Sequence, residues 1–163
     1  MSKFSFLSWN IRHFKGGQPR LDEVDAFIAS LDPDIFGLIE YQGKSGIREL
    51  MVHRFPEYDF AVTDSTGNLE VVVGFRRDHF DQVVWTQKRT FNDVKRRLRP
   101  GALISVRLGG EFYNLLFLHS DSGTREIDYK NRQKVFKKVW KLNAALKKRS
   151  ATGKSNLIVL GDL

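Results

Sequence analysis

Four polar side chains follow apolar, strand-like runs at the points where buried strands are expected to end. In layered α/β proteins, binding and catalytic groups collect where strands finish and loops begin. Four such positions in one chain therefore predict a single site assembled from distant parts of the sequence. The four residues are Asn10, Glu40, His119 and Asp162.

The chemistry of these four side chains suits a phosphate ester and a hard cation. Mg²⁺ is held by one or two carboxylates, together with water and phosphate oxygens, so Glu40 and Asp162 are candidate metal ligands. Asn10 can orient a carboxylate or bind phosphate. His119 can donate a hydrogen bond to a phosphate oxygen or help to transfer a proton. Taken alone, Asn10 and Glu40 are better explained as the first residues of loops, and His119 is equally well explained as a structural histidine.

Composition limits the possible classes of protein. The chain has 163 residues, 41% of them hydrophobic, with 13 Phe and 3 Trp, which predicts one folded domain over residues 1–163. The absence of cysteine excludes disulfides, thiolate catalysis and cysteine–zinc sites. No apolar run approaches the roughly 18 residues of a membrane span, and the N-terminus resembles a strand rather than a secretory signal. We therefore expect a cytoplasmic protein without a membrane partner.

The charge balance favours polyanionic partners. Lys and Arg together number 27 against 19 acidic residues, which gives a net charge of +8. Residues 95–99 form a concentrated cationic segment that could contact successive phosphates. The lysines of residues 128–149 are better explained as a solvated helix face. Nucleic acid is the expected partner, with anionic lipid or a phosphorylated small molecule as alternatives.

Hydrophobic periodicity predicts interleaved helices and strands. Apolar residues recur at helical spacing over 21–31 and 128–149, and a shorter helix is expected around residues 47–51. Residues 35–39 form a continuous apolar run, which is typical of a strand buried on both faces. The other expected strands are 4–9, 58–62, 70–75, 83–85, a hairpin of 102–108 with 112–118 about Gly109-Gly110, and 156–160.

Together, four short segments resemble the endonuclease/exonuclease/phosphatase superfamily. They are Ser8-Trp9-Asn10-Ile11, Pro33-Asp34-Ile35-Phe36-Gly37-Leu38-Ile39-Glu40, Leu118-His119-Ser120 and Ile158-Val159-Leu160-Gly161-Asp162. Their order and spacing match across the whole chain. The resemblance implies the deoxyribonuclease-I-like fold, a four-layer α/β sandwich of two packed sheets flanked by helices.

The resemblance also implies roles for the four strand-end residues. Asn10 and Glu40 would lie at a bound Mg²⁺ or Mn²⁺, with Asn10 also near phosphate. His119 would contact the scissile phosphate. Asp162 would lie at the attacked phosphate and orient water or metal.

Three further residues take weaker roles from the same resemblance. Glu70 would support the strand-end histidine, although it could equally be an exposed strand carboxylate. Arg99 or Arg97 would contact phosphate, with the register between them left open.

The chain departs from the family pattern at its end. The pattern requires an Asn two residues after Asp162, and the sequence given stops at Leu163. Family members continue into a late Asp-His pair, for which His13, His53 and His79 are misplaced. We therefore expect about the N-terminal three-fifths of a domain, with most of the second sheet lying beyond it. Such a chain would be inactive alone and would self-associate or hold its missing C-terminal portion.

The resulting expectation is a Mg²⁺-dependent phosphodiesterase, most simply a nuclease acting on DNA or RNA. One alternative is a phosphatase or sphingomyelinase-like member of the same superfamily. Another is an inactive fragment or a basic nucleic-acid-binding module.

Overall fold

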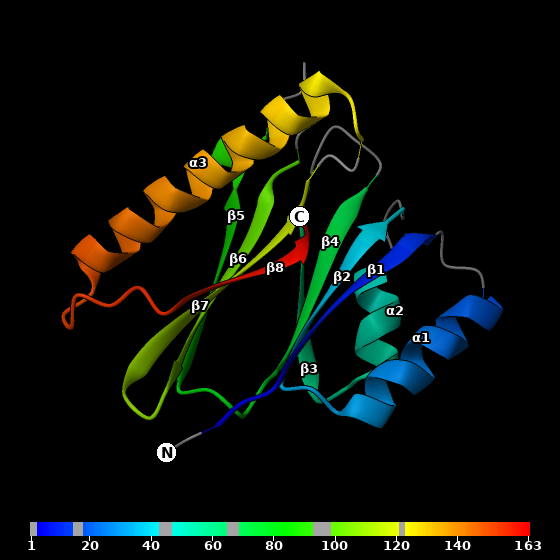
Figure 1. The fold of residues 1–163 in the computed structure, drawn as a ribbon. Coiled ribbons are helices and arrows are strands. Elements are labelled where there is room, and N and C mark those ends of the chain that lie inside the picture. Colours follow the sequence, from blue (N-terminus) through cyan, green and yellow to red (C-terminus); the bar gives the residue numbers. More distant parts are fainter. Residues whose placement is uncertain (1–2, 15–17, 43–46, 65–68, 93–98, 121–122) are drawn as a thin grey trace.

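The computed structural model describes the chain except for residues 1–2, 15–17, 43–46, 65–68, 93–98 and 121–122. Two four-stranded sheets pack face to face, and helices cover both outer faces (Figure 1). The predicted four-layer α/β sandwich is therefore confirmed. Among the described residues, no helix is long and apolar enough to pass through a membrane.

The first sheet has the strand order β1-β2-β4-β3. Strands β1 and β2 are parallel and are joined by helix α1, whereas β4 runs antiparallel to both of its neighbours. Helices α1 and α2 pack on the outer face around Leu21, Ile28 and Met51, all of which are buried. The elements are β1 (Phe6–Phe14), α1 (Gln18–Leu31), β2 (Ile35–Tyr41), α2 (Ile47–Arg54), β3 (Tyr58–Val62) and β4 (Glu70–Arg76).

The second sheet has the order β5-β6-β7-β8. The predicted hairpin forms β6 and β7, and the long helix α3 leads from β7 to the parallel strand β8. Val135 of α3 packs on Leu103 and Leu116 of the sheet's outer face. The elements are β5 (Gln82–Lys88), the 3-10 helix η1 (Arg89–Phe91), β6 (Gly101–Leu108), β7 (Glu111–His119), α3 (Glu126–Arg149) and β8 (Leu157–Asp162).

One fold expectation is wrong. The second sheet was expected to come largely from residues beyond Leu163, but four strands of this chain build it. The expected uncovered sheet faces are also absent from the described residues, because α1, α2 and α3 bury both outer faces. Strand β6 pairs antiparallel with both β5 and β7, its neighbours in sequence, so the sheet forms within the chain.

The two sheets are held together by an apolar layer in which one aromatic ring fills the place of a missing side chain. Phe117 of β7 lies against Gly37 of β2, and a Cβ at residue 37 would stand 2.2 Å from the Phe117 Cδ1 atom. Ile39 and Val73 of the first sheet contact the same layer. Glycine at position 37 therefore permits the close approach that brings the ends of β2 and β7 together.

Strand β1 extends further than predicted. Asn10 was expected to end the strand, but β1 continues to Phe14, which pairs with Tyr41. The pairing shifts register between Asn10 and Phe14, and Arg12 has a φ of 49°. The polar residues therefore mark an irregularity inside the strand rather than its end, and this irregularity lies beside the predicted site.

Candidate active site

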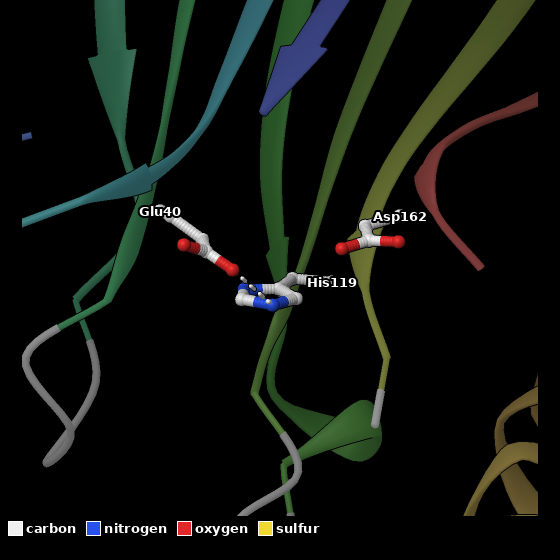
Figure 2. Close-up of side chains that lie close together, drawn as sticks. All are labelled: Glu40, His119 and Asp162. Carbon is white, nitrogen blue, oxygen red and sulfur yellow. Dashed lines mark ion pairs between the residues drawn. The ribbon is translucent and has the colours of Figure 1, made fainter. Parts of the chain in front are cut away.

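Glu40, His119 and Asp162 lie together at one end of the two sheets. Each offers one possible ligand atom, and these three atoms lie within 4.8 Å of one another. Figure 2 shows the three side chains pointing into the same space. Glu40 comes from β2 of the first sheet, whereas His119 and Asp162 come from the adjacent strands β7 and β8 of the second. The site thus spans the junction between the sheets.

Glu40 reaches this space because strand β2 is irregular at that point. The pairing of β2 with β4 shifts register between Ile39 and Tyr41, and Glu40 adopts a φ of 66°. A non-glycine residue in this left-handed region costs about 1–3 kcal/mol and persists only where its surroundings enforce it. Irregularities of this kind redirect a side chain next to functional sites. Here the irregularity turns Glu40 toward the second sheet.

His119 is the last residue of β7, and its side chain is only 5% exposed. Its Nε2 atom lies 3.2 Å from Oε1 of Glu40, whose side chain is 14% exposed (Figure 2). Because both groups are largely shielded from water, their interaction is stronger than that of a surface pair.

Asp162 is placed opposite His119 by the parallel pairing of β7 with β8. The residue before it is Gly161, whose φ is 122° and where a Cβ would lie 2.0 Å from the Leu118 carbonyl oxygen. Only glycine fits this position without displacing the backbone. The Ser120 N–H donates to the Asp162 carbonyl at 2.8 Å, which continues the strand pairing past the site.

Asn10 connects the first sheet to Asp162. Its Nδ2 donates to Asp162 Oδ2 at 3.0 Å, and its Oδ1 accepts from the Arg12 N–H at 2.9 Å. Arg20 donates to the Ile11 carbonyl at 2.8 Å, which ties the same irregular stretch of β1 to α1. Asn10 is therefore held on both sides and fixes one oxygen of the Asp162 carboxylate.

The remaining predicted residues lie outside this group of three ligands. The Glu70 carboxylate accepts from Thr63 Oγ1 at 2.5 Å, at the start of β4. Arg99 is half-buried and precedes β6 by two residues. Because Ala102 pairs with Phe117, Arg99 lies at the same end of the second sheet as the site. Arg97 and the rest of residues 93–98 lie outside the described residues.

Two supporting residues were not foreseen from the sequence. Arg12 and Gly161 make no predicted contact with substrate, yet the first supplies the N–H that holds Asn10 and the second allows the backbone turn before Asp162. A glycine directly before a strand-end carboxylate was a visible signal for the second. Nothing in the sequence identified the first.

The donor set fits a hard divalent cation. Two carboxylates with an adjacent histidine match the oxygen-rich sites that hold Mg²⁺ with additional water and phosphate oxygens. Without a cation, the close approach of the Glu40 and Asp162 carboxylates is unfavourable because like charges repel. The approach is nevertheless maintained, by the left-handed backbone at Glu40 and by the hydrogen bond from the Asn10 amide to Asp162. A cation between the two carboxylates would remove this repulsion.

Sequence comparison alone identifies no relative. No family model matches the chain, and no curated protein matches it either.

Solved structures, in contrast, match it over almost its whole length. D. rerio TDP2 complexed with single strand DNA product is 19% identical, with a TM-score of 0.69 over 99% of this chain and 60% of that chain. An endonuclease/exonuclease/phosphatase family protein from Bacteroides thetaiotaomicron is 18% identical, with a TM-score of 0.62 over 98% and 62%. The 3′ phosphatase NExo from Neisseria, bound to product DNA hairpin, is 15% identical, with a TM-score of 0.65 over 98% and 57%.

These similarities confirm the expected resemblance at the level of the fold. The chain spans only 57% to 62% of the length of the three solved chains. Both the two-sheet architecture and the order of its elements agree with the sequence motifs. The chain therefore has the deoxyribonuclease-I-like, four-layer α/β fold seen in endonuclease/exonuclease/phosphatase proteins.

Proposed function

We propose that this chain carries the active site of a phosphodiesterase that uses a divalent cation, expected to be Mg²⁺, to hydrolyse nucleic acid. The observation that carries the proposal is the convergence of Glu40, His119 and Asp162 within 4.8 Å at the junction of two sheets. A nucleic-acid substrate is supported by the net charge of +8. It is also supported by the fold shared with two proteins whose structures contain product DNA.

Glu40 and Asp162 are the residues that would hold the cation, and Asn10 lies beside them. When bound, such an ion neutralises negative charge that develops on the phosphoryl group. Asn10 keeps Asp162 in one orientation through the 3.0 Å hydrogen bond. This support matters because a freely rotating carboxylate would lose conformational entropy on binding a cation.

His119 would bind the scissile phosphate. Its Nε2 lies 3.2 Å from the Glu40 carboxylate, at the point where the three ligand atoms converge. In the proposed reaction an N–H group of the His119 ring would donate a hydrogen bond to a non-bridging phosphate oxygen. Removal of one such donor from a phosphoryl or acyl transfer site typically slows catalysis by about 10²–10³-fold.

Asp162 would act on the attacking water. Asn10 occupies Oδ2, which leaves Oδ1 to accept a hydrogen bond from water. The water oxygen bonds to phosphorus as the ester bond to the leaving oxygen breaks, in line and on the opposite side. Asp162 takes up the water proton, and the leaving oxygen is protonated by solvent.

Three other residues have roles that extend this proposal. Arg99 lies at the site's end of the second sheet and would contact a phosphate next to the one attacked. Arg97, which lies outside the described residues, is the alternative candidate for this contact. Glu70, whose carboxylate accepts a hydrogen bond from Thr63 Oγ1, would support His119.

A phosphomonoester is the second candidate substrate. The same groups can bind a terminal phosphate, and the similarity to a 3′ phosphatase favours a nucleic-acid end over a lipid headgroup. The sphingomyelinase-like alternative is tested by including sphingomyelin vesicles in the substrate panel below.

The test combines cation binding with a substrate panel. Mn²⁺ titrated into the ¹⁵N-labelled chain should broaden the amide resonances of residues 40, 119 and 162 first, and Glu40→Gln should abolish this. The panel comprises single-stranded DNA with and without a 3′ phosphate, RNA and sphingomyelin vesicles, each with Mg²⁺. Glu111→Gln, at the opposite end of β7, is the matched control.

Each outcome distinguishes the proposed phosphodiesterase from the alternative functions. Metal-dependent turnover that disappears in Glu40→Gln and persists in Glu111→Gln supports the proposal. Equal turnover in both variants defeats it. Cation binding without hydrolysis by residues 1–163 agrees with the expectation that they are inactive alone, so the panel is repeated with any sequence that follows Leu163 in the reading frame. Absence of hydrolysis there as well would favour an inactive fragment or a nucleic-acid-binding module.

A further inference from the structure

A second concave surface lies at the other end of the second sheet. It is a groove of about 580 Å³ between the C-terminal turns of α3, the α3–β8 connection and the β6–β7 hairpin. Figure 1 shows these elements at the end of the sheet away from the chain's C-terminus. The groove reaches Phe112, whereas the candidate active site holds His119 on the same strand. Seven residues of strand separate the two, about 23 Å.

The groove has a cationic rim. Arg107, Arg149 and Lys154 line it from β6, the end of α3 and the connection to β8. Within the described part of the chain, none of the three makes an ion pair with a carboxylate. Glu111 is the single carboxylate among the lining residues, and it accepts a hydrogen bond from the Tyr113 hydroxyl. The rim therefore carries an excess of positive charge.

The floor of the groove is polar where a sheet face under a helix would ordinarily be apolar. Ser105 Oγ donates to Asn114 Oδ1 at 2.6 Å, and Asn114 Nδ2 donates to the Ser155 carbonyl at 2.6 Å. Asn114 is only 7% exposed. Ser155 Oγ in turn donates to Asn143 Oδ1 of α3 at 2.5 Å. This chain of hydrogen bonds joins both sides of the groove, so its shape is formed before any ligand arrives.

One wall of the groove is apolar. Val84, Phe112 and Leu146 line it, and Phe112 and Val84 are exposed. The Arg107 guanidinium lies 5.9 Å from the centre of the Phe112 ring. A flat ring system can pack against such a wall, while guanidinium groups bind phosphate oxygens in a bidentate manner. Ligand pockets of this size combine an apolar lining with a few polar groups in the same way.

From these features we infer that the groove binds a small phosphomonoester that carries a ring, of the size of a mononucleotide. Arg149 and Lys154 bind the phosphate, and the ring packs against Phe112 and Leu146. The volume exceeds what inorganic phosphate alone would fill. The inference is independent of the proposed function, because it concerns different residues and a binding event without chemistry.

Binding is tested by titrating adenosine monophosphate and, separately, inorganic phosphate into the ¹⁵N-labelled full chain in EDTA. The expected result is a saturable shift of the Asn114 side-chain amide and of the Gly110 amide. The double variant Arg149→Gln/Lys154→Gln should weaken the affinity at least tenfold. Lys147→Gln/Lys148→Gln removes the same charge from exposed neighbours outside the groove and should change it less than twofold.

Two further measurements guard against misinterpretation. Thr152→Trp fills the groove without changing charge and should also abolish the shifts, with circular dichroism reporting on folding. Affinity that falls equally in both double variants would indicate unspecific charge attraction and overturn the inference. Shifts confined to residues 40, 119 and 162, no saturable binding by the wild-type chain, or inorganic phosphate binding as tightly as the nucleotide would each overturn it too.

Discussion

The side-chain amide of Asn10 donates to the carboxylate of Asp162 at 3.0 Å, although 152 residues separate the two in sequence. This hydrogen bond joins the edge strand β1 of one sheet to the edge strand β8 of the other. It also leaves the second Asp162 oxygen available to solvent or substrate. The geometry makes Asn10 a positioning residue for the proposed chemistry.

Replacing Asn10 should therefore slow turnover without unfolding the protein. In Asn10→Ala the Asp162 carboxylate loses its donor, and activity is expected to fall about 10–100-fold, as for other residues that orient a metal ligand. Asn10→Asp should reduce activity further, because a second carboxylate beside Asp162 repels it. Steady-state kinetics with a Mg²⁺ titration measure both effects. Unchanged kcat and Mg²⁺ dependence in both variants would contradict the role.

His119→Gln should reduce kcat by about 10²–10³-fold, the range for loss of one donor to the transferring group. Cation binding should persist, because Glu40 and Asp162 remain. His79→Gln is the matched control, since His79 faces Asp34 at the far end of the first sheet. Similar losses in the two variants would show that His119 acts only through stability.

Gly161→Ala should be among the most destabilising small substitutions. A Cβ there would meet the Leu118 carbonyl oxygen at 2.0 Å, and the φ of 122° is unsuitable for alanine. Gly153→Ala shares a positive φ of 69° but meets nothing within 4 Å, so it should lose about 1–2 kcal/mol from conformation alone. Gly161→Ala should exceed about 3 kcal/mol once steric overlap is added. Urea unfolding of the two variants compares these values directly.

The first turn of α3 predicts a specific acid sensitivity. Hydrogen bonds from the Arg125 side chain and backbone lower the pKa of Asp128 below the usual 3.8, and Asp128 is 1% exposed. A carboxyl group with a lowered folded-state pKa stabilises the fold above its unfolded pKa. This contribution is lost as the pH falls through the folded-state value.

Thermal unfolding between pH 7 and pH 2 tests this assignment. Asp128→Asn should lower Tm most near neutral pH, and the difference from wild type should narrow below about pH 4. Asp78→Asn, in an exposed turn, should leave the pH profile unchanged. A constant difference between wild type and Asp128→Asn at all pH values would refute the charge-based explanation.

The outer side of α3 predicts self-association of the chain. Trp140 is 77% exposed, and Phe136, one turn earlier on the same helix, is 50% exposed. Neighbouring exposed aromatic groups of this kind commonly mark contact surfaces. Sedimentation velocity should show a concentration-dependent increase in mass that Trp140→Lys suppresses and Lys137→Gln does not. A monomer at all concentrations would rule this out.

Much of the fold could be predicted because its periodicities are local. Apolar residues at helical spacing predicted α1 and α3 to within a few residues, and strand-like apolar runs predicted the β6–β7 hairpin equally closely. The true extent of β1 could not be predicted, because Arg12 and its neighbours return to the strand through a register shift that tertiary pairing stabilises. The strand order of the second sheet could not be predicted either, because the sequence of one strand does not identify the strands with which it pairs.

The site shows a similar division. The types and order of Asn10, Glu40, His119 and Asp162 indicated phosphate and metal chemistry, and the structure brings these residues together. The left-handed backbone of Glu40 was not predictable, because the sequence Ile39-Glu40-Tyr41 contains no glycine or turn signal. The polar groove under α3 was missed for another reason: Ser105 and Asn114 lie within strands that were assigned from their apolar neighbours.

The contact of Phe117 with Gly37 has a consequence for how this protein would lose its activity on heating or under pressure. Glu40 belongs to one sheet and its two companions belong to the other, so their spacing is only as constant as the alignment of the two layers. A slight slip of one layer over the other would separate the carboxylates while every helix and strand stayed intact. Heat, pressure or a larger side chain at position 37 should thus abolish cation binding at the site well before spectroscopy detects any loss of secondary structure.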